Sequence, residues 1–446
     1  MTIKTLVLPF GYPGYPQKEL KEKLDNSVAY LKSLGIDAVA TPHIITLEDC
    51  EAAIEVAKRD DYDYCVVLLG SWIECPNVLN IISAAQLDKM PLLLWSHDNV
   101  YDEKNDEYIS FGSVAVAAVL RETFEEFEYC FKFVVGNDGD EKLAKEITAF
   151  DRAAKCIKKL QNTRIGMIGY ASMGMYTGLG DHIKIKKLLG TEVVHLDQFT
   201  LVNRAIAMDQ KRIDEYKPVM QSEWSLAEDI SDEDINKTIA FYLALKDLVK
   251  EHKLDGVTVK CQYELSIEYG FTPCVALSIL GAEMPVSCEG DVYMLLTQMI
   301  LGYVSGETTT YGDVLAFQGN SIISAACGFA PRCFLNAARP CIKRHTALYS
   351  GLLVTTGIKG DMPATVSRVA NYKDGLKMHV LQGRTEELNN FHEIDCPSYP
   401  GARIHLLNKT GEEFANEVMS QHYVMVFNDY TDALRAFCEM KGIKIV

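Results

Sequence analysis

The run of six apolar residues at Tyr64–Leu69, which ends at Gly70, constrains the fold of this chain more than any other feature. A strand that is apolar at every position, without alternation, is typical of a parallel sheet with helices on both faces. Segments with helical periodicity separate this run from the other strand-like runs of the first third, at residues 6–9, 37–41 and 91–95. Strands and helices that alternate in this way predict a doubly wound parallel α/β domain, which we place at residues 1–161.

Two further domains are predicted from the remainder of the chain. Strand-like runs at residues 164–168, 192–196, 256–260 and 284–288 alternate with helical segments. Residues 162–310 are therefore expected to form a second α/β domain with a doubly wound parallel sheet. Beyond Gly306 the helical periodicity fades, and short β-like runs are separated by glycine and proline. This pattern predicts a C-terminal antiparallel β domain, barrel-like, at residues 311–446.

Composition narrows the functional classes. The 446 residues carry a net charge of −17 without a basic patch, which argues against nucleic acid as a partner. No apolar run reaches the length of a membrane helix, and we interpret the start of the chain as a buried strand rather than a signal peptide. The thirteen cysteines include no CxxC pair, which favours reduced core thiols in a cytoplasmic protein over a zinc knuckle. A reactive thiol at Cys261, Cys274 or Cys327 stays open.

Acidic side chains that follow the strand-like run at 284–288 form the first candidate site. The run ends in Cys288-Glu289-Gly290-Asp291, and a long apolar helical pattern begins immediately afterwards. In open α/β sheets, ligands collect at the carboxyl ends of the strands. Two carboxylates at that place can hold a hard divalent metal ion or move a proton. A simpler role for Asp291, as the cap of the following helix, is equally compatible with the sequence.

Two other regions supply groups that would complete such a site. Lys260 and Glu264 follow the strand-like run at 256–260, and we expect Glu264 to reach towards Asp291 as a second carboxylate. His422 opens an apolar run near the end of the chain, where an imidazole facing a cleft would join the carboxylates. This combination of ligands suits Mn²⁺, Co²⁺ or Mg²⁺ better than zinc.

The glycine-rich stretch at residues 169–178 lacks the GK[ST] of a P-loop and does not fit GxGxxG. Its hydroxyl groups at Ser172, Tyr176 and Thr177 suit a neutral polyhydroxylated ligand better than a pyrophosphate. The alternative is a loop whose glycines permit close packing. The sequence contains neither GxSxG nor HExxH, so serine hydrolase and zincin chemistry lack support.

Together these motifs resemble the L-fucose isomerase and L-arabinose isomerase superfamily, and in particular its short bacterial L-fucose isomerase-like members. The resemblance runs over nearly the whole chain. It rests on four motifs in register, which are similar in turn to the first α/β domain, the glycine-rich loop, the Glu-x-Asp metal motif and the C-terminal metal histidine of that family. They are Leu69-Gly70-Ser71-Trp72 with Ser96-His97-Asp98, Ser172-Met173-Gly174, Cys288-Glu289-Gly290-Asp291, and Gln421-His422-Tyr423.

The resemblance implies an aldose–ketose isomerase that converts a monosaccharide through a cis-enediol, with a divalent metal, commonly Mn²⁺, and no organic cofactor. It also implies a homotrimer or homohexamer with active sites between subunits. Asp291 would be a metal ligand and the proton carrier, and His422 a second ligand. We expect Glu264 to be the other catalytic and metal-binding carboxylate, with Glu268 or Glu289 as alternatives. Contacts with the sugar are expected from Ser172, Met173, Lys260, Glu289 and Arg332.

The chain departs from the family pattern at two places. No acid lies near Pro273-Cys274, where L-fucose isomerase has one, and Ala326 stands where many short members have a histidine before Cys327. Two alternatives to a neutral-sugar isomerase stay open. One is an isomerase for an anionic hexose, sulfonated or phosphorylated, such as sulfoquinovose, with cations from the cluster at 332–344 and from Arg403. The other is a non-catalytic sugar-binding or regulatory protein on the same fold.

Overall fold

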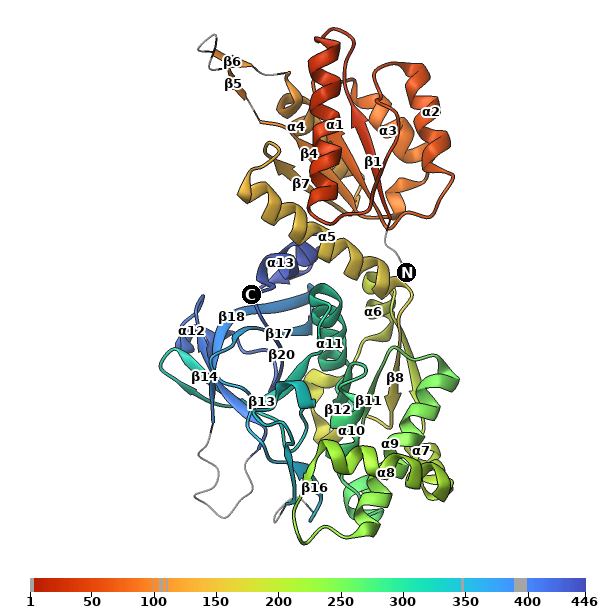
Figure 1. Ribbon diagram of the computed structural model, residues 1–446, viewed down its shortest axis with the longest axis vertical. Helices are drawn as coiled ribbons and strands as arrows, with labels where there is room; N and C mark the ends of the chain where they lie inside the picture. The colour runs from red at the N-terminus through yellow and green to blue at the C-terminus, as the bar shows by residue number, and fades with distance from the viewer. Residues whose placement is uncertain are drawn as a thin grey trace. The chain divides into compact units, whose positions relative to one another are not determined.

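The computed structural model describes residues 4–98, 100–102, 104, 107–109, 111–345, 349–388 and 399–446. The chain divides into two compact units. Unit 1 comprises Met1–Lys158 and Asp432–Gly442, and unit 2 comprises Lys159–Thr431 and Ile443–Val446. Their helices and strands are labelled in Figure 1. The domain boundaries predicted from the sequence at residues 161 and 310 stay predictions.

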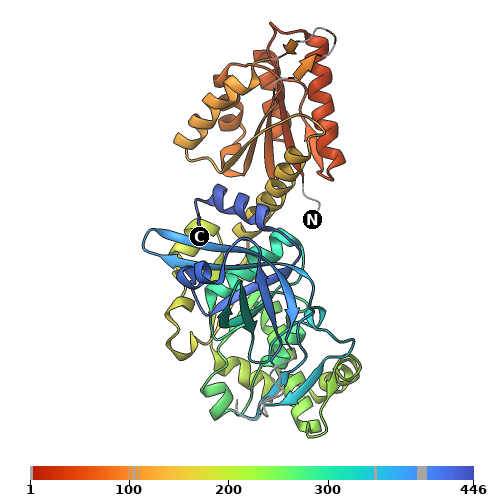
Figure 2. The same ribbon diagram turned by 90° about the vertical axis from the view of Figure 1, so that its left-hand side faces the viewer.

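Unit 1 contains a five-stranded parallel sheet in the order β2-β1-β3-β4-β7. Every residue of β3 is buried, as the unbroken apolar run predicts. Helices lie on both sides of this sheet (Figure 2), so its central strands β1 and β3 are buried on both faces. The strands are β1 (Thr5–Phe10), β2 (Ala38–Ala40), β3 (Tyr64–Leu69), β4 (Leu92–Ser96) and β7 (Phe131–Val135), with the hairpin β5 (Val100–Asp102) and β6 (Glu107–Ile109). The helices are α1 (Gln17–Ser33), α2 (Leu47–Ala57), α3 (Cys75–Ala84), α4 (Ser113–Glu126), α5 (Glu141–Gln161) and α13 (Thr431–Lys441).

Unit 2 begins with a second parallel sheet, in the order β12-β11-β8-β9. The register places Ile168, Val259 and Cys288 beside one another, so the loops that follow β8, β11 and β12 leave the sheet at the same edge. The strands are β8 (Arg164–Ile168), β9 (Glu192–Leu196), β11 (Gly256–Val259) and β12 (Val286–Cys288). The helices are α6 (His182–Leu189), α7 (Gln198–Ile206), α8 (Gln210–Glu223), α9 (Asp232–His252), α10 (Cys274–Leu280) and α11 (Val292–Ser305).

The rest of unit 2 is a closed antiparallel barrel. Its six strands pair in the order β17-β20-β13-β14-β19-β18, and a further pairing of β17 with β18 closes the ring. The barrel strands are β13 (Thr310–Gln318), β14 (Ser321–Ala325), β17 (Pro363–Tyr372), β18 (Gly375–Glu387), β19 (Gly401–Leu406) and β20 (His422–Phe427). Two parallel α/β sheets and one antiparallel barrel confirm the predicted fold class.

Smaller elements complete unit 2. A three-stranded sheet joins β10 (Ser225–Leu226), β15 (Cys341–Arg344) and β16 (Leu352–Val354), while β21 (Lys444–Ile445) pairs in parallel with β18. Helix α12 (Gly411–Glu417) precedes β20. Across the described residues, we find no helix with both the length and the apolar character needed to cross a bilayer.

The interior of the barrel should contribute strongly to the stability of unit 2. Leu381 is 0% exposed within its core, whereas Leu315 on β13 is 48% exposed. We expect Leu381→Ala to lower the free energy of unfolding by about 2–5 kcal/mol, because it removes buried contacts and leaves a cavity. The matched Leu315→Ala change should cost no more than about 0.5 kcal/mol. Urea denaturation followed by circular dichroism measures both, and equal effects would contradict this account of the core.

Candidate active site

Three non-glycine residues with left-handed backbone conformations lie in the loops at the shared carboxyl edge of β8, β11 and β12. They are Met173 (φ 51°), Tyr263 (φ 67°) and Glu289 (φ 64°). Each such conformation costs on the order of 1–3 kcal/mol and persists only where the surroundings impose it, which is common at functional sites. The three strained residues therefore mark this edge of the sheet as a candidate functional site.

The glycine-rich loop at 169–178 packs directly against the turn that holds Glu289. The backbone N–H of Ser172 donates to the carbonyl of Glu289 (2.7 Å). Gly290 has φ +68°, and any side chain there would run into the backbone of Tyr170. A Cβ on Gly178 would lie 3.3 Å from Asp291. The glycines therefore permit the close approach of two loops, which was the second of the two roles that the sequence left open.

Asp291 is the cap of helix α11 and also the centre of a buried ion network. Its Oδ1 accepts from the backbone N–H of Met294 (2.8 Å). The guanidinium of Arg368, on β17, donates to both carboxylate oxygens (2.8 and 3.0 Å) and to the carbonyl of Thr177 (2.9 Å). The side chains of Asp291 and Arg368 are 1% and 0% exposed. Burial raises the pKa of Asp291, but Arg368 and His422 outweigh it and hold this pKa well below its usual range.

His422, the first residue of β20, joins this network through both ring nitrogens. Its Nδ1 lies 2.9 Å from Oδ2 of Asp291. Its Nε2 lies 3.3 Å from a carboxylate oxygen of Glu289 and 3.3 Å from one of Asp313. Burial lowers the pKa of His422, but the bonds with Asp291, Asp313 and Glu289 outweigh it and raise this pKa well above its usual value. We refer to Glu289, Asp291, Asp313 and His422 as the acid–imidazole cluster.

The cluster can hold a cation by its composition. Three carboxylates surround the imidazole of His422, and one of them, Asp291, also pairs with the guanidinium of Arg368. The three acids outnumber the two basic groups, so the groups carry an excess of negative charge. The side-chain amide of Gln421 joins the cluster through hydrogen bonds. Its Nε2 lies 3.1 Å from Asp313 and 3.3 Å from Nε2 of His422. A histidine whose second nitrogen is fixed by a carboxylate is the usual arrangement of an imidazole that binds a metal.

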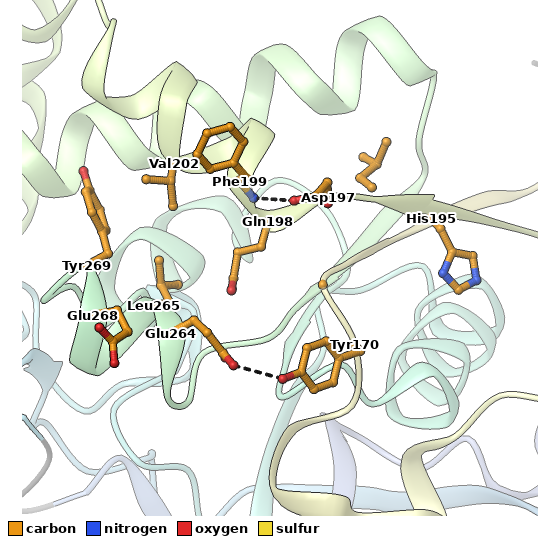
Figure 3. A pocket seen from close by; sticks show the side chains of 12 residues that line it. Tyr170, His195, Asp197, Gln198, Phe199, Val202, Glu264, Leu265, Glu268 and Tyr269 are labelled. Carbon is orange, nitrogen blue, oxygen red and sulfur yellow. Dashed lines mark hydrogen bonds between the residues drawn. The ribbon is translucent and has the colours of Figure 1, made fainter.

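Glu264 lies in a different environment from the one expected. It begins a helical turn after β11, Glu264–Glu268. Its carboxylate forms an ion pair with the buried Lys260 and accepts from the hydroxyl of Tyr170 (3.0 Å; Figure 3). The Lys260 Nζ lies 3.8 Å from the centre of the Tyr170 ring. Among the described residues, no hydrogen bond or ion pair joins Glu264 to Asp291.

Glu264 and Glu268 instead line a cavity of about 690 Å³ at the carboxyl ends of β8, β9 and β11. Its other polar lining residues include Tyr170, Asp197 and Gln198 (Figure 3). Cavities at this edge of an α/β sheet are the usual place for small ligands. The acids expected to act together thus divide between this cavity wall and the acid–imidazole cluster.

The remaining predicted residues differ in their surroundings. Ser172 is buried, and its hydroxyl has no hydrogen-bond partner among the described residues. Met173 is 46% exposed. Arg332 lies 3.7 Å from Glu223 in an ion pair, and Arg403 contacts Gln318 and Glu386. Another group of side chains that could bind a metal consists of Cys261, Cys288 and Glu289.

Sequence reasoning missed Arg368 and Asp313. Arg368 lies within a buried barrel strand, where a cation is exceptional, and the apolar texture of that strand concealed it. Asp313 faces His422 because β13 and β20 pair with these two residues in register. The sequence predicted that Glu264 would reach Asp291. Correcting this would have required knowing that Lys260 lies close enough to pair with Glu264.

Comparisons with known proteins point to sugar isomerases. No family model matches the chain. It is 20% identical over 441 residues to proteins named sulfoquinovose isomerase from Priestia aryabhattai and Priestia megaterium, covering 96% of this chain and 95% of each relative. It is 22% identical over 450 residues to a sulfoquinovose isomerase from Clostridium sp. (strain MSTE9), covering 97% of this chain and 96% of that protein. The chain is thus similar over nearly its full length to sugar isomerases.

The Asp291–Arg368 pair should be far more sensitive to truncation than an exposed pair. We expect Arg368→Met to reduce the free energy of unfolding by about 3–5 kcal/mol, because it leaves a buried carboxylate without its counter-charge. Arg384→Met is the matched control, since Arg384 pairs with Asp361 at the surface of the same barrel, and it should cause no measurable change. Urea denaturation at neutral pH makes the comparison. Equal stability of the two variants would refute the importance assigned to the buried pair.

Proposed function

We propose that this protein is an aldose–ketose isomerase, and that its substrate is an anionic hexose of the sulfoquinovose type. The observation that carries the proposal is the acid–imidazole cluster, in which one buried histidine meets three carboxylates. Tyr170, whose backbone packs against Gly290 in the turn of the cluster, also lines the ligand-sized cavity. The relatives named sulfoquinovose isomerase support both the reaction class and the anionic substrate. An isomerase for a neutral monosaccharide is the alternative.

The reaction requires a group that removes a proton from one carbon and returns it to the next, through a cis-enediol. Asp291 is a weak base for this task, because its pKa is lowered and Arg368, His422 and the helix N-terminus engage its oxygens. Glu264 is half exposed on the cavity wall, where a sugar can reach it. We therefore assign the proton transfer to Glu264, held in place by Lys260 and Tyr170.

The donor set of the cluster fits a hard divalent cation. Nε2 of His422 and the carboxylates of Glu289 and Asp313 converge within hydrogen-bond range, and one nitrogen with several oxygens suits Mn²⁺, Co²⁺ or Mg²⁺. A bound cation of this kind would stabilise negative charge on the sugar oxygens during isomerisation. Asp291 would orient the His422 ring through Nδ1, so that Nε2 faces the other two carboxylates.

Proton exchange at the sugar tests the reaction class and names the substrate. We expect incubation with Mn²⁺ in D₂O to place deuterium at C2 of sulfoquinovose and to form its ketose, whereas glucose should exchange much more slowly. Proton NMR, with and without EDTA, provides the measurement. Exchange with glucose alone would establish the neutral-sugar alternative. Metal binding without exchange on any aldose, anionic hexoses included, would favour a non-catalytic sugar-binding role.

Paired substitutions separate proton transfer from metal binding. Glu264→Gln should lower kcat by about 10²–10⁴-fold while the bound Mn²⁺ is unchanged, because only the base is lost. Glu289→Gln should instead reduce the Mn²⁺ content measured by elemental analysis. Glu251→Gln serves as control, since Glu251 pairs with Arg204 at the surface. A Glu264→Gln variant with normal kcat would transfer the role of base to Glu268 or Glu289.

A further inference from the structure

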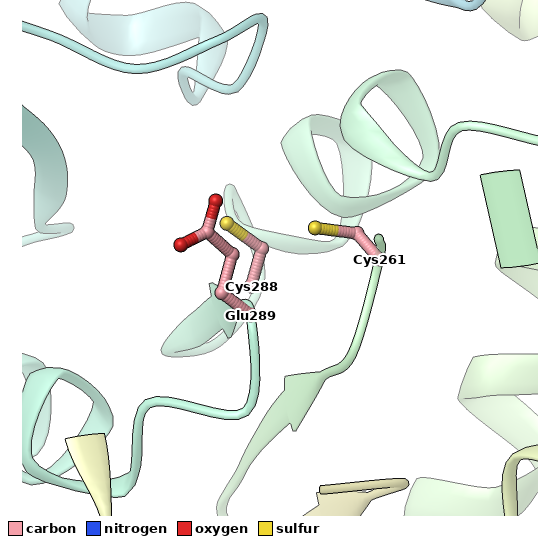
Figure 4. Close-up of side chains that lie close together, drawn as sticks. All are labelled: Cys261, Cys288 and Glu289. Carbon is pink, nitrogen blue, oxygen red and sulfur yellow. The ribbon is translucent and has the colours of Figure 1, made fainter. Parts of the chain in front are cut away.

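Two cysteine thiols and one carboxylate meet at the carboxyl ends of β11 and β12. Cys288 is the last residue of β12, and Cys261 follows β11 by two positions. Their sulfur atoms and a carboxylate oxygen of Glu289 all lie within 4.8 Å of one another. In Figure 4 the sulfur of Cys261 points towards Cys288, and the sulfur of Cys288 lies beside the Glu289 carboxylate. Both thiols are free.

This spacing is close to that of a metal site. Two zinc–sulfur bonds of about 2.3 Å at a tetrahedral angle hold their sulfur atoms about 3.8 Å apart. The sulfur atoms of Cys261 and Cys288 lie within 4.8 Å of each other, so a shift of about 1 Å or less brings them to that distance. The backbones that hold them are neighbouring strands of one sheet, so the pair is already organised by the fold.

The side chain of Tyr311 is buried at the same place. Burial raises its pKa first, and the nearby Cys288, which lies within hydrogen-bond reach of the hydroxyl, raises it further. A thiol is a weak hydrogen-bond partner, so a ligand held by the thiols would give this buried hydroxyl a stronger one.

We propose that Cys261, Cys288 and Glu289 form a binding site for a thiophilic divalent cation, with Zn²⁺ as its representative. Thiolate ligands select soft or borderline cations such as Zn²⁺, whereas carboxylate and imidazole groups also accept Mn²⁺ or Mg²⁺. The site is thus chemically different from the acid–imidazole cluster, although the two share Glu289. Tyr311 lies beside the thiols as a potential hydrogen-bond donor to the coordinated groups.

Sharing Glu289 has a consequence that rests on the proposed function. A carboxylate bound to a cation at the thiols is withdrawn from His422, to which it now lies 3.3 Å away. Occupation of the thiol site and of the acid–imidazole cluster should therefore oppose each other. Excess Mn²⁺ should displace a cation from the thiols if the cluster binds Mn²⁺, and should leave it in place if the cluster does not.

Co²⁺ is the spectroscopic probe for the thiol site. Titrated into the full-length protein under a reductant that does not bind metals, it should produce a saturable thiolate-to-cobalt charge-transfer band. Cys261→Ala and Cys288→Ala should abolish the band, whereas Cys156→Ala, a buried thiol of α5, should retain it. A wild-type protein without this band would overturn the proposal.

X-ray absorption at the zinc edge gives a test that needs no substitution. The wild-type protein loaded with one equivalent of Zn²⁺ should show two sulfur ligands, and a spectrum with only nitrogen and oxygen ligands would overturn the proposal. Neither measurement uses a sugar. A protein that binds Co²⁺ through thiolates but isomerises nothing would therefore contradict the proposed function alone, and the reverse result would contradict the thiol site alone.

Discussion

The buried ion pair between Asp291 and Arg368 is the interaction on which the candidate site depends. Removing two charges from water is costly, and their attraction offsets that cost only when further hydrogen bonds satisfy both groups. Here the helix N-terminus, the carbonyl of Thr177 and the ring of His422 supply those bonds. The pair thereby connects α11, the barrel strand β17, the glycine-rich loop and β20 at one point.

Most of the fold was accessible from the sequence, but only part of the site was. The unbroken apolar run at β3 and the alternation of strands and helices predicted parallel sheets, because a strand that is buried on both faces is apolar at nearly every position. His422 and Glu289 were identified because a polar residue at a strand end interrupts an apolar pattern. Arg368 could not be identified in this way, because it lies within a buried strand. A cation at that position is explained only by its pairing with Asp291, which the sequence does not reveal. Asp313 likewise acquires meaning only through the register of β13 with β20.

The assignment of Asp291 shows why residue type and position do not settle a role. An aspartate that caps α11 and an aspartate that binds a metal would have the same sequence signature, an acid between a strand and a helix. The structure shows that the cap is formed and that the same carboxylate pairs with Arg368. A carboxylate engaged in this way is a poor proton acceptor but a firm support for an imidazole. Glu264, half exposed and facing a cavity, has the access to a substrate that Asp291 lacks.

Glu289 occupies the one position from which both kinds of ligand can be reached. Its left-handed backbone (φ 64°) directs the carboxylate between the imidazole of His422 and the thiols of Cys261 and Cys288. An ordinary strand end would project this side chain to a single face. Gly290 packs against the Tyr170 backbone and the backbone N–H of Ser172 donates to the carbonyl of Glu289, so the glycine-rich loop supports the turn that carries this carboxylate. The same carboxylate thus lies between an imidazole and a second carboxylate on one side and two thiols on the other, two sets of groups that differ in the cations they would prefer.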